Sequence, residues 1–534
     1  MSGQRDELTG SRNVFSWLGA LAAALLLAAC ASLPPQSGRV ESHVIANTAD
    51  TQLGRTLAPM LARHPGESVF YPLSGGPDAL VARLALARTA QRSLDMQYYI
   101  FDADATGKTL MAAVVAAADR GVRVRLLLDD LHMAGQDRAL AALDSHPNIE
   151  VRLFNPFASR GLRAPEMAFE FSRLDRRMHN KSMTADNQLT VVGGRNVGDP
   201  YFSADAGSDF TDLDLLAGGP VVPQVSAVFD DYWNGAASYP VASLIRPPED
   251  APAELARLRR YLDEHVAEAR STAYARELVG SGLARALEGG KLPAYWGAAT
   301  VIADQAAKVT LPPADNASHA IPKLAALLGT AQRELSLVSP YFVPDRKAAD
   351  WLTGMARRGV KVRILTNSFA ATDVSAVHAG YSPWRKELLE ARIELYELKP
   401  SAYAELAHGE HARRSLISKS RASLHAKSYM VDGHLLFVGS LNLDPRSARL
   451  NTEMGVVVDS ADLCTLLGKA LDERLLDVAY KLMLEPDPSG GGSRLVWVTR
   501  EDGLLRTYDS EPGMGFLQHL GQGMLRILPL ESEL

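Results

Sequence analysis

Cysteine is nearly absent from this chain, and so is any basic excess. Only Cys30 and Cys464 occur among 534 residues, and Cys30 ends an N-terminal apolar run, which leaves Cys464 without a partner. A framework of disulfide bonds is therefore excluded. The net charge of -6 gives no global attraction to nucleic acid, although a local groove can still be basic.

Long apolar runs are also missing, apart from residues 15–29 (FSWLGALAAALLLAA). This run falls short of the about 20 residues that a membrane-spanning helix needs. Arg5 and Arg12 precede it, and the small residues of LAAC (27–30) end it, a pattern that predicts a signal peptide over residues 1–30. An uncleaved membrane anchor is the alternative interpretation.

The LAAC sequence resembles the lipobox of bacterial lipoproteins. That resemblance implies that Cys30 is lipidated and becomes the new N-terminus. Ala31 at the next position resembles lipoproteins of the outer membrane. We therefore expect a membrane-associated lipoprotein on the periplasmic side of the outer membrane.

The two halves of the chain repeat each other. TAQRSLDMQYYIF (89–101) returns as TAQRELSLVSPYF (330–342), and RGVRVRLLLDD (120–130) returns as RGVKVRILTNS (358–368). A helical stretch separates the two strand-like runs in each copy, and such alternation predicts an α/β layered fold. Because single cores seldom exceed about 300 residues, a chain of this length suits two duplicated lobes.

The repeat divides the chain into six segments. We expect, in order, a signal peptide, a tether, a first lobe, a helical insertion, a second lobe, and a C-terminal hairpin with an amphipathic helix (1–30, 31–65, 66–235, 236–320, 321–485 and 486–534). The hairpin turns at Asp502-Gly503. The final helix is expected to dock on a lobe, with a lipid surface as the alternative.

One short motif carries the chemistry, and it occurs twice. HNKSMTAD (179–186) and HAKSYMVD (425–432) both have the form His-x-Lys-x4-Asp, and Gly-[Gly/Ser]-x-Asn follows each at the same distance. A shuffled chain of this composition would contain the form only about 0.02 times. Strand residues two apart point to the same face, so the imidazole and the ammonium group project together.

Two such pairs around one cavity suit the transfer of a phosphoryl group. Ammonium and amide groups stabilise a phosphate whose oxygens gain charge in the transition state. One histidine attacks phosphorus, and the other protonates the leaving alcohol oxygen. Because the lysines supply the positive charge, we expect neither a metal nor any other cofactor.

The duplicated motif resembles that of the phospholipase D superfamily, and the resemblance covers most of residues 66–485. Within the superfamily the chain is similar to the bacterial cardiolipin synthases, especially their C-type branch, in KSMTADNQLTVVGGRNVGDPYF (181–202), TDLDLLAGGPVV (211–222) and LRILPLESEL (525–534). The resemblance implies two mixed α/β lobes about a pseudo-twofold axis, with the active site at their interface. It also implies a phosphohistidine intermediate that water or an alcohol attacks.

Matching motif to motif yields two half-sites: His179, Lys181 and Asn196 in the first, and His425, Lys427 and Asn442 in the second. Because the N-terminal motif usually supplies the nucleophile in the superfamily, we assign attack to His179 and acid catalysis to His425.

The resemblance also implies roles for acidic residues. Asp186 and Asp432, which complete the motifs, are expected to support the structure more than the chemistry. A further carboxylate on the strand after each motif should orient each histidine. We expect Glu453 to serve His425 and Asp214 to serve His179, with Asp212 as the competitor.

We therefore expect a phosphatidyltransferase of the cardiolipin synthase type, which transfers a phosphatidyl group to phosphatidylglycerol at a membrane surface. A phospholipase D that hydrolyses phospholipids shares every catalytic residue and is the alternative. A superfamily nuclease fits a chain with both motifs and an anchor signal less well, and nucleic acid is not expected as a ligand. An inactive scaffold ranks last because both motifs are intact.

Residues 408–428 hold five Lys or Arg against one Glu. Such a charge run is either a solvated face or, beside His425, a site that gathers anionic lipid headgroups.

Replacement of Cys30 by serine tests the anchor. We expect Cys30→Ser to accumulate as an unprocessed precursor, because the thiol that accepts the lipid is missing. Growth with a radioactive fatty acid should label the wild-type chain and the control Cys464→Ser, but not Cys30→Ser. Equal labelling of Cys30→Ser and wild type would exclude the lipoprotein assignment.

Overall fold

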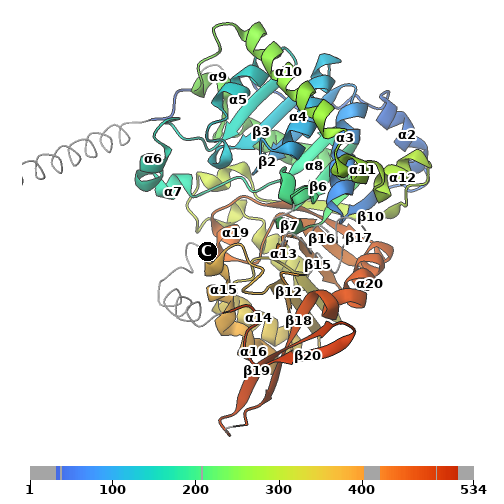
Figure 1. Ribbon diagram of the computed structural model, residues 1–534, viewed down its shortest axis with the longest axis vertical. Coiled ribbons are helices and arrows are strands. Elements are labelled where there is room, and N and C mark those ends of the chain that lie inside the picture. Colours follow the sequence, from blue (N-terminus) through green and yellow to red (C-terminus); the bar gives the residue numbers. More distant parts are fainter. Residues whose placement is uncertain (1–31, 37–38, 206–207, 402–420, 489, 515–534) are drawn as a thin grey trace, which may run out of the picture.

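The computed structural model describes residues 32–36, 39–205, 208–401, 421–488 and 490–514. The signal peptide with Cys30, residues 408–420 of the basic run and the C-terminal amphipathic helix lie outside these ranges. Figure 1 shows two lobes, with the N-terminal half above the C-terminal half. Within the described ranges, no helix combines the length and the apolar character needed to cross a membrane.

The first lobe is a mixed sheet with the strand order β9-β4-β3-β2-β5-β6-β8-β1, in which only β2, β3 and β4 are mutually parallel. Its strands are β1 (Ser68–Leu73), β2 (Ser93–Tyr98), β3 (Arg123–Asp129), β4 (Ile149–Phe154), β5 (Ser182–Ala185), β6 (Leu189–Gly193), β8 (Asp214–Gly218) and β9 (Ser238–Pro240). Its helices are α2 (Gln52–Leu61), α3 (Gly76–Thr89), α4 (Ala105–Asp119), α5 (Asp137–Asp144), α6 (Arg163–Phe169), α7 (Phe171–Leu174), α8 (Val221–Asn234) and α9 (Val241–Leu244), with the 3-10 turns η1 (Asp130–His132) and η2 (Asp199–Phe202).

The second lobe repeats this order as β18-β13-β12-β11-β15-β16-β17-β10, and β19 and β20 extend it beyond β18. Its strands are β10 (Tyr295–Ala303), β11 (Glu334–Val338), β12 (Lys361–Asn367), β13 (Glu394–Leu398), β15 (Lys427–Val431), β16 (Leu435–Gly439), β17 (Met454–Asp459), β18 (Ala479–Pro486), β19 (Ser493–Glu501) and β20 (Leu504–Tyr508). Its helices are α13 (Ile321–Leu328), α14 (Arg346–Arg357), α15 (Ser375–Tyr381), α16 (Arg385–Glu390), α19 (Pro445–Arg449) and α20 (Ala461–Val478), with the 3-10 turns η3 (Ala306–Val309), η4 (Asn316–Ser318) and η5 (Ser382–Trp384).

Local sequence explains the parallel centre of each sheet. In β3, the residues from Val124 to Leu128 are buried on both faces, as a strand covered by helices on both sides requires. Leu126 and Leu128 lie in the core with α4, and Leu127 packs with residues of α8. The preceding helix α4 begins at Asp104, whose side chain accepts a hydrogen bond from the Gly107 amide, and an alanine-rich sequence continues it.

The strand β10 joins the two sheets. Its first three residues pair with β1, and the next six pair with β17. A β-carbon on Gly297, at this transition, would lie 2.2 Å from the carbonyl oxygen of Asp459, so glycine is required there. The segment expected as a helical insertion, 236–320, thus also contains β9 and β10, besides the helices α10 (Ala251–Ala269), α11 (Ala273–Val279) and α12 (Gly282–Glu288).

A continuous apolar core lies between the lobes. It includes Val221 and Val225 of α8, Leu463 and Leu475 of α20, and inner residues of both sheets such as Val192. Separate cores lie under the outer helices of each lobe. Because the central core draws on both halves, burial of apolar surface holds them together.

The aspartate of each motif begins a hairpin turn. Asp186 and Asp432 have φ values of 52° and 52°, and each turn connects two paired strands. The Asp186 carboxylate accepts hydrogen bonds from the amides of residues 91, 92 and 93 at 2.7–3.1 Å, and that of Asp432 accepts from residues 332, 333 and 334 at 2.7–2.9 Å. These contacts explain why the TAQR sequence is repeated with the motif.

Substitution of these aspartates should affect stability unequally. Asp186 is fully buried, so Asp186→Ala leaves backbone amide donors without a hydrogen-bond acceptor. This should lower the free energy of unfolding by about 2 kcal/mol. Asp432→Ala should cost less, because its partners are exposed and water can replace the carboxylate. Urea unfolding measures both variants. A loss in Asp432→Ala as large as that in Asp186→Ala would contradict this interpretation.

Candidate active site

Backbone pairing brings the first motif to the second lobe. The amide of His179 donates to the carbonyl oxygen of Thr452 at 2.9 Å, and the amide of Thr452 donates to Arg177 at 2.9 Å. Met178 and Thr452 form an isolated parallel bridge. The residues just before β5 therefore lie against the residues that lead into β17.

The second motif makes the matching contact with the first lobe. A short strand before it, β14 (Arg421–Leu424), pairs in parallel with β7 (Ser208–Thr211). The amide of His425 then donates to the carbonyl oxygen of Thr211 at 2.8 Å. Each histidine is thus fixed by backbone hydrogen bonds to the opposite half of the chain.

The carboxylates that contact the histidines cross between the lobes. His179 Nδ1 donates to Glu453 Oε2 at 2.9 Å, and His425 Nδ1 donates to Asp212 Oδ2 at 2.5 Å. The expected pairing of Glu453 with His425 is wrong, because the Thr452 contact carries Glu453 to the other histidine. Asp212, the competitor in the sequence, is the carboxylate beside His425.

Asp214 does not contact either histidine but forms a buried ion-pair cluster. Its Oδ2 accepts from Arg83 at 3.0 Å and from Arg195 at 3.1 Å. Strand register explains why Asp214 was chosen wrongly. Asp214 of β8 pairs with Gly193 of β6, and the equivalent pair in the second lobe is Gly455 of β17 with Gly439 of β16. Asp214 is therefore equivalent to Gly455 and not to Glu453.

A signal for the correct residue was present in the sequence. Asp212 and Glu453 both follow a threonine, Thr211 or Thr452, and these threonines supply the carbonyl oxygens that fix the histidines. Asp214 and Gly455 occupy equivalent positions in the two lobes, so the residues two positions earlier, Asp212 and Glu453, are equivalent as well.

The two lysines lie behind their histidines. Lys181 Nζ donates to the carbonyl oxygen of His179 at 2.5 Å, and Lys427 Nζ donates to that of His425. Both lysine side chains are only 1% exposed. Each ammonium group therefore contacts the backbone of its own histidine. His179 and Lys181 precede β5, and His425 precedes β15, so the strand spacing used in the prediction does not apply to these residues.

Electrostatic influence across the lobes shows that the motifs share one environment. Burial lowers the pKa of His179 well below its ordinary value, and both lysines and His425 lower it further. Burial also lowers the pKa of Lys181 and Lys427, and each lysine disfavours the charge of the histidine in the other motif. The two motifs therefore influence each other within one buried site, where burial is the largest cause of the lowered pKa values.

The two carboxylates differ in their protonation. Burial raises the pKa of Glu453 to about 7, although Lys181 opposes this shift. Burial also acts to raise the pKa of Asp212, but His425 and Lys427 overcome it and hold that pKa below its ordinary value. Asp212 is therefore the more firmly ionised partner. Burial and Lys427 lower the pKa of His425 below its ordinary value, but Asp212 opposes this shift, whereas the pKa of His179 falls well below its ordinary value.

Several neighbours of the histidines were not identified from the sequence. Ser440 and Ser447 donate hydrogen bonds to Glu453 at 2.5 Å and 2.9 Å. A tyrosine ring lies edge-on to each imidazole, Tyr99 at 5.1 Å from His179 and Tyr201 at 5.3 Å from His425. Ser440 belongs to the Gly-[Gly/Ser]-x-Asn sequence, but no pattern assigned it to Glu453 or singled out the other three residues.

The two asparagines differ in their contacts. Asn196 Oδ1 accepts a hydrogen bond from the Ile100 amide at 3.2 Å. The buried Asn442 Oδ1 has no hydrogen-bond partner among the described residues. Nor do the described ranges contain a group of three or more His, Cys, Asp or Glu that could hold a metal ion.

Comparisons with known proteins agree with this arrangement. The family described as "Cardiolipin synthase, PLD-like domain" matches residues 84–233 and 324–475, one match in each half. Cardiolipin synthase C of Escherichia coli K12 is 42% identical over 480 residues, which cover 90% of this chain and 99% of that protein. A protein of Helicobacter pylori J99, described as uncharacterized, is 31% identical over 91% of this chain and 93% of its own length.

A solved structure supports the fold. The crystal structure of phosphatidylserine synthase from Haemophilus influenzae Rd KW20 has a TM-score of 0.55 at 12% identity and covers 87% of this chain and 95% of that chain. The family matches place a phospholipase D-like unit in each half, as the duplicated motif predicts. The chain therefore belongs to the cardiolipin synthase family of phospholipase D-like phosphatidyltransferases.

Proposed function

We propose that this enzyme transfers a phosphatidyl group from a donor phospholipid to phosphatidylglycerol and so forms cardiolipin. One observation carries the proposal: two buried His–Lys pairs, one from each half, share a single site. Ammonium groups there suit a phosphodiester, whose oxygens gain charge as phosphorus is attacked.

The first step joins the phosphatidyl group to His179. Its Nδ1 is engaged by Glu453, so Nε2 is the nitrogen with a free lone pair, and its lowered pKa keeps it unprotonated. Nε2 attacks phosphorus, and the bond from phosphorus to the donor's alcohol oxygen breaks. His425, whose protonated form Asp212 favours, donates its Nε2 proton to that oxygen.

The second step reverses the first with a new alcohol. A glycerol hydroxyl of phosphatidylglycerol gives its proton to His425 Nε2, and its oxygen attacks phosphorus. The bond between phosphorus and His179 Nε2 breaks, and cardiolipin is released. Water in place of the hydroxyl would yield phosphatidic acid, which is the product of the alternative phospholipase D activity.

The proposal includes a place at a membrane. A phospholipid substrate presents its phosphate at the bilayer surface, and an N-terminal lipid on Cys30 would keep the enzyme there. The tether that follows Cys30 contacts the first lobe from residue 36 onward, where Gln36 donates to Ala236 and Arg39 donates to Gly235. The outer membrane, on its periplasmic side, is the location that Ala31 favours.

Lipid analysis tests the proposed reaction. The purified full chain, incubated with vesicles of phosphatidylglycerol and phosphatidylethanolamine, should produce a four-chain lipid that mass spectrometry detects. Lys181→Ala should slow its formation at least about 10²-fold, the effect of removing one group that stabilises a charged transition state. Phosphatidic acid as the only product would establish the hydrolase instead, and an added chelator should leave the rate unchanged.

Trapping of the intermediate tests the roles of the histidines. With a p-nitrophenyl phosphatidyl ester, His425→Asn should still form a covalent phosphatidyl adduct, because this leaving group needs no proton. His179→Asn should form none, because the attacking nitrogen is missing. Intact-protein mass spectrometry measures the adduct, and peptide mapping locates it. An adduct on His425 would reverse the two roles.

Two neighbouring aspartates provide a matched control. Asp212→Asn should behave like His425→Asn and retain the adduct while losing turnover of natural lipids, since the charge that favours imidazolium is gone. Asp214→Asn should lower Tm, because it weakens a buried pair with Arg83, but should retain turnover in its folded fraction. Equal loss of turnover in both variants would contradict the crossed pairing.

A further inference from the structure

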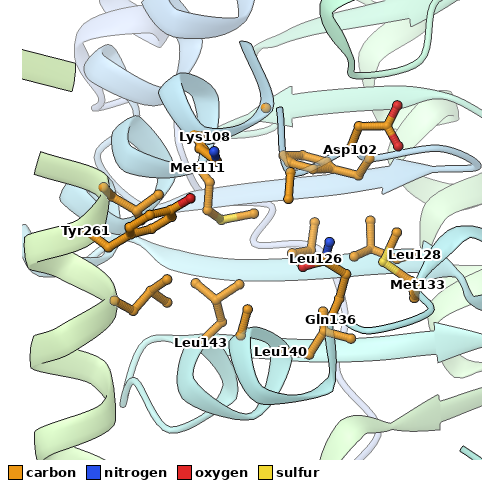
Figure 2. Close-up of a pocket in the computed structure, with 16 residues that line it drawn as sticks. Asp102, Lys108, Met111, Leu126, Leu128, Met133, Gln136, Leu140, Leu143 and Tyr261 are labelled. Atoms are coloured by element: carbon orange, nitrogen blue, oxygen red, sulfur yellow. The ribbon is translucent and has the colours of Figure 1, made fainter. Parts of the chain in front are cut away.

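An apolar pocket lies in the first lobe, outside the catalytic site. Its volume is about 190 Å³, and it lies between β3, α4, α5 and α10 (Figure 2). Met111, Leu126, Leu140 and Leu143 turn toward the same space, and the Asp102 carboxylate is directed away from it. The interior of the pocket is therefore hydrocarbon, and its few polar groups belong to its edge.

The pocket reaches the end of the sheet at which the catalytic residues lie. Asp102 and Met133 line it from the loops that follow the parallel strands β2 and β3. The Tyr99 ring lies 5.0 Å from the His132 ring and 5.1 Å from the His179 ring. Because Met133 follows His132 directly, one edge of the pocket lies one residue from a ring that contacts the same tyrosine as His179.

The helix α10 forms the outer wall. Leu262 is buried, whereas Tyr261 is 50% exposed, so this wall is thin and borders on solvent. Lys108 Nζ lies over the Tyr261 ring at 5.2 Å and places a cation at the edge of the pocket. An apolar interior with a few polar groups at its edge is typical of a site for an amphipathic ligand.

We propose that this pocket binds one acyl chain of the phospholipid whose phosphate lies between His179 and His425. The inference rests on the proposed function for the identity of the lipid. Only two glycerol carbons separate the phosphate oxygen from the nearest acyl ester. The acyl chain must therefore begin close to the catalytic site, and the pocket offers it hydrocarbon contacts there. The phospholipid acyl chain, not a free fatty acid or a segment of protein, is the occupant.

Photo-crosslinking locates the chain without requiring turnover. Phosphatidylglycerol with a diazirine near the end of one acyl chain is added to the full-length protein in vesicles and irradiated. Label should appear in peptides that contain residues 126–143 and 258–262. Label that is absent from these peptides, although the protein binds the vesicles, would overturn the proposal.

A substitution that fills the pocket should change the preference for chain length. Ala139 lines the pocket from α5, so Ala139→Phe should lower the ratio of kcat/KM for dioleoyl over dihexanoyl phosphatidylglycerol at least about tenfold, given how strongly apolar pockets respond to single methylene groups. It should also reduce the crosslink. Ala116→Phe, on an exposed position of α4, should change neither.

The two experiments separate the two proposals. Crosslinking in the pocket without formation of a four-chain lipid would contradict the proposed function and leave the acyl site standing. An unchanged chain-length ratio and crosslink in Ala139→Phe, with the variant folded by its Tm, would overturn the acyl site and leave the function standing. If Ala139→Phe does not fold, the crosslink in the wild-type protein decides alone.

Discussion

The structure depends on hydrogen bonds in which each catalytic histidine is held by a carboxylate of the other half. Glu453 contacts His179, and Asp212 contacts His425, so neither half contains an oriented histidine of its own. The backbone amides of the same two histidines also donate hydrogen bonds across the interface, to the carbonyl oxygens of Thr452 and Thr211. Separation of the lobes would break all four bonds together, which makes the interface a condition of the chemistry. The continuous apolar core supplies the free energy that keeps it closed.

The proposed mechanism gives the two similar half-sites opposite tasks, and small differences between the half-sites bear on that division. Ser440 stands beside Glu453 where the first lobe has Gly194, and a β-carbon on Gly194 would lie 2.5 Å from Asp212. The first lobe therefore has no room for the serine. The hydroxyl groups of the second lobe do not prevent burial from raising the pKa of Glu453, whereas Asp212 stays ionised beside His425. A neutral nucleophile and a protonated acid require this difference.

The sequence was sufficient for features that depend on local patterns and failed where tertiary register decides. The motif repeat predicted the two α/β lobes. The strand period used to place Lys181 beside His179 does not apply, because both residues precede β5. The choice between Asp212 and Asp214 depended on which residue faces Gly193, and the threonine that precedes both Asp212 and Glu453 gains its meaning only from backbone contacts of the folded chain. The alanine-rich β10 lacks the alternation of a strand and forms because both sheets offer it an edge.

The same geometry bears on the choice between water and a lipid alcohol at the second step. In the proposed mechanism both acceptors meet the same phosphohistidine, so the proposed catalytic residues alone do not discriminate between them. Discrimination requires binding energy that water lacks. The proposed acyl site is occupied by the phosphatidyl group during this step, so it does not hold the acceptor but covers the loops after β2 and β3, at the edge of the site nearest to His179. In this proposal transfer exceeds hydrolysis because hydrocarbon displaces water near phosphorus, while a lipid alcohol reaches phosphorus from the bilayer.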